Sequence, residues 1–317
     1  MATTTIKNYL SLVKFSHTIF ALPFALIGFF LGITALDFVF PYPQGLHESI
    51  GWNASLYGLK NSNFSLERFF LIKFILVIIC MITARSAAMA FNRYLDSHFD
   101  AKNPRTAIRE IPAGIISKES ALRFVIINCV VFITATFFIN QICFFLSPVA
   151  LFVVLFYSYT KRFTALCHLV LGVGLSLAPI GAYLAVTGQF ALLPILFSFA
   201  VLFWVSGFDI IYALQDEDFD RSQQLHSIPA AIGKTKALRL SELLHLLSAG
   251  FILYAGYFGQ FGFWYWAGAG FFVCLLIYQH LLVKPNDLSK VNMAFFTTNG
   301  IASIVFSVFV LLDIFLN

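Results

Sequence analysis

Residues 69–100 read FFLIKFILVIICMITARSAAMAFNRYLDSHFD, a long apolar run that leads into Asn92, Asp96 and Asp100. The apolar part is long enough to cross a bilayer as a helix. Because the three polar residues are four apart, a helix would place them near one face over about three turns. This stretch predicts a membrane helix that carries a row of oxygen ligands at its end.

A second stretch repeats this arrangement. Residues 191–220 read ALLPILFSFAVLFWVSGFDIIYALQDEDFD, in which Asp216 and Asp220 follow another apolar run. Two similar acidic motifs, separated by several spans, suggest a pseudo-repeat that brings their carboxylates together across a central cavity.

Composition supports a membrane protein. Of the 317 residues, 60% are hydrophobic and 11% are charged, and the mean hydropathy is +0.86. Soluble domains typically have about 25% charged residues. A helix makes its backbone hydrogen bonds within its own segment, as lipid requires, so we expect an all-α, polytopic membrane protein. Polar and turn-rich breaks predict nine spans, near residues 15–36, 69–92, 120–140, 143–160, 165–187, 191–213, 237–258, 262–282 and 292–316.

We expect residues 1–317 to form a single membrane domain. The first apolar run is long enough to span and is read as a retained helix. With the N-terminus inside, almost all Lys and Arg outside the spans lie in inside segments, whereas only Lys60 and Arg68 lie outside. This asymmetry places residues 93–119 and 214–236 in cytoplasmic loops of the site, and residues 37–68 in an extracytoplasmic loop. A bacterial cytoplasmic membrane is the expected location.

Crowded carboxylates near lipid repel one another and lose hydration, a cost that a divalent cation offsets. Oxygen ligands without neighbouring His or Cys favour Mg²⁺, which usually completes its coordination with phosphate and water. Lys102, Arg105 and Arg109 follow the first motif, and acids beside bases are typical of a polyphosphate site. The alternative is that these cations only reflect the positive-inside bias.

Other polar residues lie close to these motifs. Tyr157, Ser158 and Lys161 end the fourth span on the same side, where they reach the cavity or, alternatively, anchor an aromatic belt. Asp209 and Arg85 lie within spans, where ionisable groups usually face the protein interior and are functional. For Asp209 the alternative is a packing hydrogen bond to a neighbouring Ser or Tyr. His17 is equally consistent with an interfacial residue and with an acceptor ligand.

The set of motifs resembles the UbiA superfamily of intramembrane prenyltransferases. The resemblance rests on Asn-x-x-x-Asp-x-x-x-Asp after the second span, Tyr-Ser-x-x-Lys after the fourth and Asp-x-x-x-Asp after the sixth. The strings at 85–93, 103–106 and 212–216 resemble the 4-hydroxybenzoate polyprenyltransferase-like branch, which includes prenyltransferases of the futalosine route to menaquinone. The sequence departs from the family at residues 14–18, where Lys-Phe-Ser-His-Thr replaces Lys-Pro-x-Gly-Thr, and in a longer 37–68 segment.

The resemblance implies roles for individual residues. It makes Asn92, Asp96, Asp100, Asp216 and Asp220 the Mg²⁺ and diphosphate ligands, with Asp96, Asp216 and Asp209 as catalytic carboxylates. Diphosphate-binding residues would be Lys102, Arg105, Arg109, Tyr157 and Lys161. Residues near the acceptor would be Lys14, His17, Arg85 and Tyr212.

The implied activity is transfer of a polyprenyl group from polyprenyl diphosphate to a ring carbon of a small hydroxylated aromatic acid in respiratory quinone biosynthesis. The expected partners are these two substrates and membrane lipid, without nucleic acid. Prenylation of haem or another lipid acceptor remains an alternative on the same acidic scaffold. A cation-coupled transporter is disfavoured, since it would place acids at mid-membrane depth rather than at one end.

Overall fold

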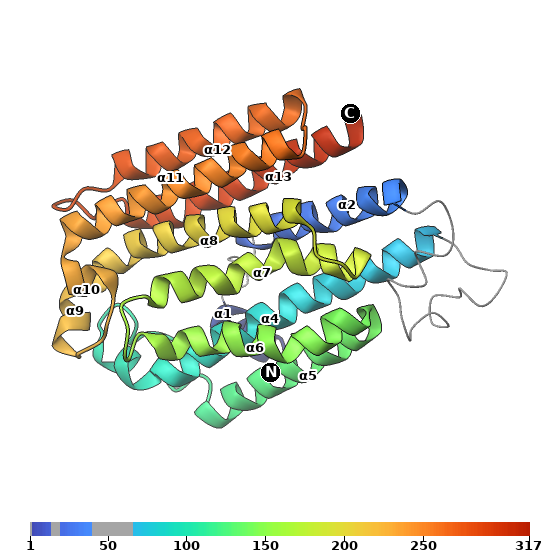
Figure 1. The fold of residues 1–317 in the computed structure, drawn as a ribbon. Coiled ribbons are helices and arrows are strands. Elements are labelled where there is room, and N and C mark those ends of the chain that lie inside the picture. Colours follow the sequence, from blue (N-terminus) through green and yellow to red (C-terminus); the bar gives the residue numbers. More distant parts are fainter. Residues whose placement is uncertain (1, 14–19, 40–65) are drawn as a thin grey trace.

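The computed structural model describes residues 2–13, 20–39 and 66–317 of the chain, and the described part is helical apart from its connections. Its long helices run roughly side by side as a bundle (Figure 1). They are α2 (Leu22–Val39), α4 (Leu66–Lys102), α5 (Lys118–Ile139), α6 (Gln141–Thr160), α7 (Cys167–Thr187), α8 (Leu192–Ala213), α11 (Lys234–Phe258), α12 (Phe263–Leu282) and α13 (Asn299–Leu316).

Among the described residues, eight helical segments are long and apolar enough to cross a membrane, and the apolar helix α2 is the shorter ninth. The expected all-α membrane fold is therefore confirmed. The bundle has α2, α7 and α8 at its centre, with α4, α5 and α6 on one side and α11, α12 and α13 on the other (Figure 1).

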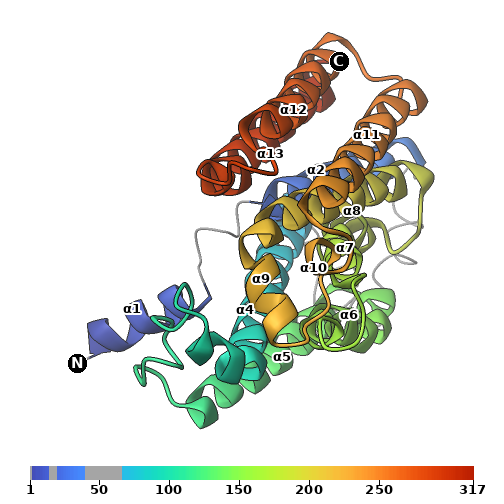
Figure 2. The same ribbon diagram turned by 90° about the vertical axis from the view of Figure 1, so that its left-hand side faces the viewer.

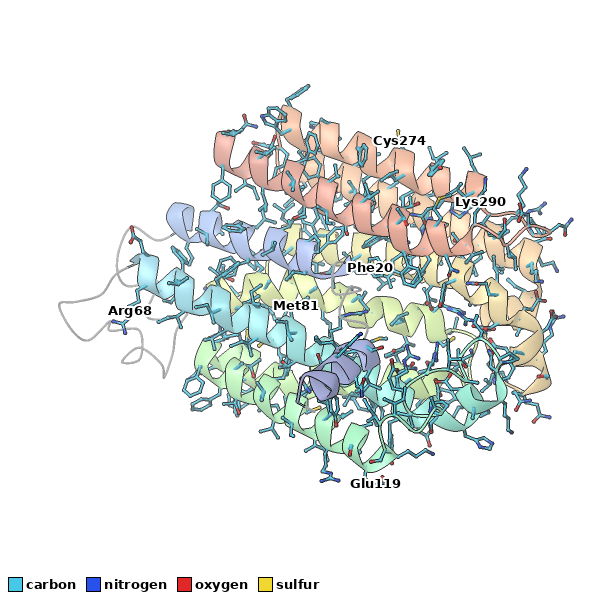
Figure 3. The ribbon with its side chains drawn as sticks, turned by 180° about the vertical axis from the view of Figure 1, so that it is seen from behind. Phe20, Arg68, Met81, Glu119, Cys274 and Lys290 are labelled. Carbon is cyan, nitrogen blue, oxygen red and sulfur yellow. The ribbon has the colours of Figure 1, made fainter. Side chains whose placement is uncertain are left out.

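Short elements gather at one end of the bundle, which we call the α9 end. They are a 3₁₀ turn, η3 (Leu214–Asp216), followed by α9 (Glu217–Ser222) and α10 (Ile228–Ile232). The helix α1 (Ala2–Leu12) lies beside the bundle (Figure 2), where Leu12 is fully buried and Tyr9 stacks on Phe124 of α5. In Figure 3, Arg68 and Lys290 mark opposite ends of the bundle.

Two predicted loops contain helix. Helix α4 continues through Lys102, so residues 93–102 of the predicted 93–119 loop are helical. Residues 214–236 hold η3, α9, α10 and the first turn of α11. The hydropathy signal ends where lipid ends, but a helix continues until a residue such as Pro104 stops it. Residues 40–65 of the predicted outer loop lie outside the described residues.

Close backbone contact joins α2 to α7. A Cβ on Gly28 would lie 2.0 Å from the carbonyl oxygen of Pro179, and a Cβ on Gly32 would lie 2.8 Å from the Val186 side chain. Small residues four apart let membrane helices approach this closely. The contact fixes α7, whose other end carries residues of the cavity described next.

Polar side chains satisfy the helix ends opposite the α9 end. Asn140 accepts a hydrogen bond from the amide of Cys143 at the start of α6, and its Nδ2 donates to the Leu184 carbonyl near the end of α7 at 2.8 Å. The fully buried Lys73 donates to the neighbouring Ala185 carbonyl at 2.7 Å. These bonds supply partners to carbonyls that a helix leaves unpaired within lipid.

Candidate active site

A cavity of about 270 Å³ opens at the α9 end. Its walls come from α4 and the 103–109 turn, from the α6–α7 connection, from α8 through α9, and from the segment that precedes α13. The cavity thus collects groups that are far apart in the sequence, and both acidic motifs face it.

The first motif lines the cavity along α4. Asn92, Asp96 and Asp100 all contribute to the wall, and Asn92 Nδ2 donates to Asp96 Oδ2 at 3.1 Å. Residues four apart on a helix are neighbours, which accounts for this bond. Because α4 remains helical through Lys102, the three side chains form the row that their spacing predicts.

The second motif reaches the cavity through a change of helix type. The turn η3 ends at Asp216 and α9 begins at Glu217. Asp216 and the fully buried Asp220 line the cavity. Glu217 instead pairs with Arg221 at 2.8 Å, and Asp218 is exposed to solvent. Glu217 and Asp218 lie between the two motif acids in the sequence, but neither lines the cavity.

Every cavity carboxylate of the two motifs has a basic partner. Arg109 Nη1 lies 2.7 Å from Asp100 Oδ1, Lys161 Nζ lies 2.7 Å from Asp220 Oδ1, Arg162 Nη2 lies 3.1 Å from Asp96 Oδ1, and Arg105 pairs with Asp216 through two nitrogens. These four pairs place positive charge directly beside the acidic rows, as a polyphosphate site requires.

The first loop contacts the second motif directly. Arg105 Nε donates to Asp216 Oδ1 at 3.1 Å, its Nη1 donates to the Tyr212 hydroxyl at 2.8 Å, and Asn103 Nδ2 donates to the same Asp216 oxygen at 3.2 Å. Burial lowers the pKa of Arg105, but the charge of Asp216 and the contacts with Tyr212 outweigh it and raise this pKa above its usual value. The predicted meeting of the two motifs is confirmed by these bonds.

Two predicted diphosphate residues differ in their placement. Lys161 lines the cavity, and although burial lowers its pKa, the Asp220 carboxylate raises it above the usual value, so the ammonium stays charged. Lys102, in contrast, is exposed, bonds Gln223 at 3.4 Å and does not line the cavity. Lys102 is the last helical residue of α4, and its position on the turn directs it to solvent. Arg162, which the sequence offered beside Lys161 as a residue that can reach the diphosphate, pairs with Asp96.

The donor chemistry of the site suits a hard divalent cation. The Oδ2 atoms of Asp100 and Asp220 are buried without a hydrogen-bond partner. Within the ranges that the structure describes, no three His, Cys, Asp or Glu side chains already converge on one point. The oxygens instead form two facing rows, and a ligand that brings its own phosphate oxygens completes such a site. These residues therefore fit Mg²⁺ held together with a diphosphate.

Aromatic side chains form another wall of the cavity. Tyr212 stacks on Phe295 with ring centroids 4.2 Å apart, Phe295 meets Phe296 edge to face at 4.6 Å, and Phe208 lies 5.3 Å from Phe295. Phe20 contributes a further ring to the cavity lining. This wall is apolar and lies directly beside the charged residues of the cavity.

A π-helical segment, η4 (Met293–Thr298), shapes this wall before α13 begins. Asn299 Nδ2 donates to the carbonyls of Ala294 and Phe295, at 3.3 and 2.9 Å. Its Oδ1 accepts from Trp204 Nε1 at 2.9 Å and from Gln279 Nε2 at 2.6 Å. The wider turn lets the consecutive residues Phe295 and Phe296 both face the cavity, and π-bulges are frequent at functional sites.

The residues predicted near the acceptor have mixed outcomes. Arg85, two turns before Asn92 on α4, lines the cavity, and its Nε is buried without a hydrogen-bond partner. Tyr212 also lines the cavity, as does Tyr157, which was predicted to bind the diphosphate. Lys14 and His17 lie outside the described residues.

Asp209 also lines the cavity, and its partner is a histidine rather than a Ser or Tyr. His168 Nδ1 lies 2.7 Å from Asp209 Oδ2, and the His168 side chain is 4% exposed. The sequence analysis did not single out His168, although an ionisable residue near the start of an expected span is a signal of a functional site. By contrast, nothing distinguished Phe20, Phe295 and Phe296 among 39 phenylalanines.

Residues 62–301 match the UbiA prenyltransferase family. The chain is 30% identical over 223 residues to 4-hydroxybenzoate octaprenyltransferase of Tolumonas auensis, covering 70% of this chain and 78% of that protein. It is also 30% identical over 233 residues to the enzyme of the same name from Nitrosomonas europaea, covering 74% and 80%.

Solved structures share the fold. A UbiA homologue from Aeropyrum pernix in its apo form superposes with a TM-score of 0.72 at 26% identity, covering 95% of this chain and 97% of that one. A UbiA homologue from Archaeoglobus fulgidus, bound to DMAPP and Mg²⁺, gives a TM-score of 0.65 at 18% identity over 97% and 99% of the chains. The second likeness shows the fold alone.

Proposed function

Because this chain belongs to the UbiA prenyltransferase family, we propose that it transfers a polyprenyl group from polyprenyl diphosphate to a ring carbon of a small hydroxylated aromatic acid. The chain is a prenyltransferase, and the proposed reaction is Mg²⁺-dependent and belongs to respiratory quinone biosynthesis. One observation carries the proposal: a single cavity joins two acidic rows, their basic partners and an aromatic wall.

The charged half of the cavity binds the donor's diphosphate. Asn92, Asp96, Asp100, Asp216 and Asp220 would hold Mg²⁺, which neutralises the leaving diphosphate when it is bound. Arg105, Arg109, Lys161 and Arg162 already lie beside these acids and supply charge-assisted hydrogen bonds to phosphate oxygens. Tyr157 and the buried Ser158, whose Oγ has no hydrogen-bond partner, add neutral donors.

The aromatic half receives the allylic end of the prenyl chain. The C–O bond to diphosphate breaks with both electrons leaving on oxygen, and the allylic carbon becomes cationic. The ring faces of Tyr212, Phe295 and Phe296 stabilise such a charge, and their apolar surface keeps water from it. A bundle embedded in lipid also gives the long isoprenoid tail an apolar path, which favours a polyprenyl donor.

The acceptor binds between Arg85 and Asp209. The unpaired Nε of Arg85 suits a carboxylate, and Asp209 suits a hydroxyl hydrogen. A ring carbon then donates an electron pair to the allylic carbon, and the proton lost from that ring carbon passes to the departing diphosphate. Small acids of the 4-hydroxybenzoate or dihydroxynaphthoate type carry both recognised groups. Haem or another lipid acceptor is the second candidate, since the acidic scaffold alone does not select the acceptor.

The α9 end faces the cytoplasm of a bacterial cell in this proposal. Among the described residues outside the spans, the basic side chains concentrate at this end, whereas Arg68 lies at the opposite end (Figure 3). Such an asymmetry orients membrane proteins with the basic side inward.

The test is a transfer assay with the purified protein in lipid vesicles. Labelled polyprenyl diphosphate and Mg²⁺ are combined with 4-hydroxybenzoate or with a dihydroxynaphthoate, and the prenylated acid is measured. We expect one acid to be prenylated, with loss of product when a chelator removes Mg²⁺ and in Asp96→Ala. No product from either acid, despite Mg²⁺-dependent consumption of the donor, would favour the haem or lipid acceptor.

A further inference from the structure

His168 stands at the start of α7 and connects two parts of the site. Its side chain is 4% exposed, and its Nδ1 lies 2.7 Å from Asp209 Oδ2 on α8. On the other edge of the ring, Nε2 accepts a hydrogen bond from the backbone amide of Ile228 at 3.3 Å. A buried imidazole with both nitrogens engaged in this way has a fixed orientation.

The partners of the ring also define where its proton lies. A backbone amide is a donor only, so Nε2 of His168 must be the unprotonated acceptor. The ring hydrogen then resides on Nδ1 and is donated to Asp209, which acts as the acceptor. This pattern of hydrogen bonds corresponds to a neutral imidazole that donates to Asp209.

The second oxygen of Asp209 remains available to a ligand. The Asp209 side chain is 22% exposed and lines the cavity. In the part of the chain that the structure describes, no other group donates a hydrogen bond to this carboxylate. A hydroxyl group in the cavity can donate to the free oxygen while His168 holds the other.

Ile228 belongs to the segment that carries the second acidic motif. It follows Ser227, which caps the short helix α10, and the amide of the adjacent His226 donates to the Lys161 carbonyl at 2.7 Å. Lys161 in turn pairs with Asp220. His168 thereby links the carboxylate on the acceptor side to the same segment that positions the donor side.

We propose that His168 is a positioning residue for the acceptor: it holds Asp209 by one oxygen so that the other oxygen receives the acceptor's hydroxyl hydrogen. The inference rests on the proposed function, since it assigns the acceptor's hydroxyl to Asp209. It also predicts that His168 acts through hydrogen bonding alone, without carrying a proton.

Two substitutions of His168 separate the loss of its hydrogen bonds from the loss of the imidazole ring. In His168→Gln, the amide nitrogen can donate to Asp209 and the amide oxygen can accept from Ile228, so both bonds are retained. In His168→Leu, both are lost. We expect the KM for the acceptor acid to rise roughly 10- to 100-fold in His168→Leu, with the KM for polyprenyl diphosphate within about two-fold of wild type. His168→Gln should recover most of the loss.

The matched control is His245→Gln, because His245 is also a buried histidine in a membrane helix but does not line the cavity. The folded fraction of the His245→Gln variant should retain the wild-type KM for the acceptor. An unchanged acceptor KM in His168→Leu, or an equal loss for donor and acceptor, would overturn the proposal. Failure of His168→Gln to recover activity would overturn the role of hydrogen bonding.

A measurement independent of turnover tests the geometry itself. Nitrogen-15 NMR of histidine-labelled protein, with the His168 signal assigned by its loss in His168→Gln, should show a neutral ring protonated at Nδ1. A ring protonated at Nε2, or an imidazolium, would contradict the proposal whatever the assay finds. If wild-type protein prenylates neither acid while His168 shows the expected tautomer, the proposed acceptor class fails, and the role of His168 toward that acceptor is overturned with it.

Discussion

Lys161 and Asp220 form an ion pair that joins the end of α6 to α9. Lys161 Nζ lies 2.7 Å from Asp220 Oδ1, and the Asp220 side chain is fully buried. A buried carboxylate is costly unless it is paired, so this cation holds α9 against the bundle and keeps positive charge at the cavity. In the proposed function, the same ammonium contacts a phosphate oxygen of the donor.

Replacing Lys161 by Gln should therefore weaken donor binding. Loss of one charge-assisted contact corresponds to roughly a 10- to 100-fold increase in the KM for polyprenyl diphosphate. The matched control is Lys102→Gln, because Lys102 is an exposed lysine at the same end of the bundle that does not line the cavity. Steady-state kinetics with varied donor would contradict the assignment if both substitutions had equal effects.

Asp220 and Asp218 provide a second matched pair, on one short helix. Asp220 is fully buried and lines the cavity, whereas Asp218 is exposed. Asp220→Asn should lower kcat/KM by about 100-fold or more, because it removes negative charge from the proposed Mg²⁺ site, and it should raise the Mg²⁺ concentration needed for half-maximal activity. Asp218→Asn should change neither quantity, and a similar Mg²⁺ dependence in both variants would argue against the assignment.

The sequence predicted the spans because lipid imposes a long apolar run on each of them. It did not predict α1, α9 and α10, because short helices at a membrane surface carry no comparable hydropathy signal. The end of α4 was missed for the same reason: residues 93–102 are polar enough to read as a loop, yet they continue the helix.

For the site, the sequence identified most of the ionisable residues that line the cavity, but not how they pair. The spacing predicted that Asp96 and Asp100 share one face of a helix. It did not predict that Arg162 pairs with Asp96 while Lys102 bonds Gln223, because these contacts depend on where each chain segment turns. The His168–Asp209 contact depends on the rotation of α7 against α8, which no local pattern encodes. The two cavity-facing phenylalanines depend on a π-helical turn.

The packing of α2 on α7 gives a prediction about stability. In Gly28→Ala, the new methyl group would meet the Pro179 backbone at 2.0 Å, so the helices must separate. Overpacking of this kind typically costs about 1–3 kcal/mol, and a thermal unfolding assay in detergent should show a clearly lower midpoint. Gly181→Ala is the control, since a Cβ there meets nothing within 4 Å. Equal midpoints for the two variants would show that the helices adjust without cost.

The aromatic wall gives a prediction about how the reaction divides between two products. If Phe296 shields the allylic cation, Phe296→Leu should let more of the cation be captured by water, which gives the prenyl alcohol instead of the prenylated acid. Loss of one ring face corresponds to roughly a 3- to 30-fold higher ratio of alcohol to prenylated acid. The ratio is a sensitive readout, because a loss of folded protein lowers both products together.

Asn299→Leu tests whether the π-helical turn is what places that ring. The substitution removes the bonds to the carbonyls of Ala294 and Phe295 and those from Trp204 and Gln279. Relaxation of the turn should move one phenylalanine out of the cavity and shift the product ratio in the same direction as Phe296→Leu. Phe315→Leu, an exposed phenylalanine on α13, should leave the ratio unchanged. An unchanged ratio in Phe296→Leu would mean that the remaining rings suffice to exclude water, and that the π-helical turn has a structural role only.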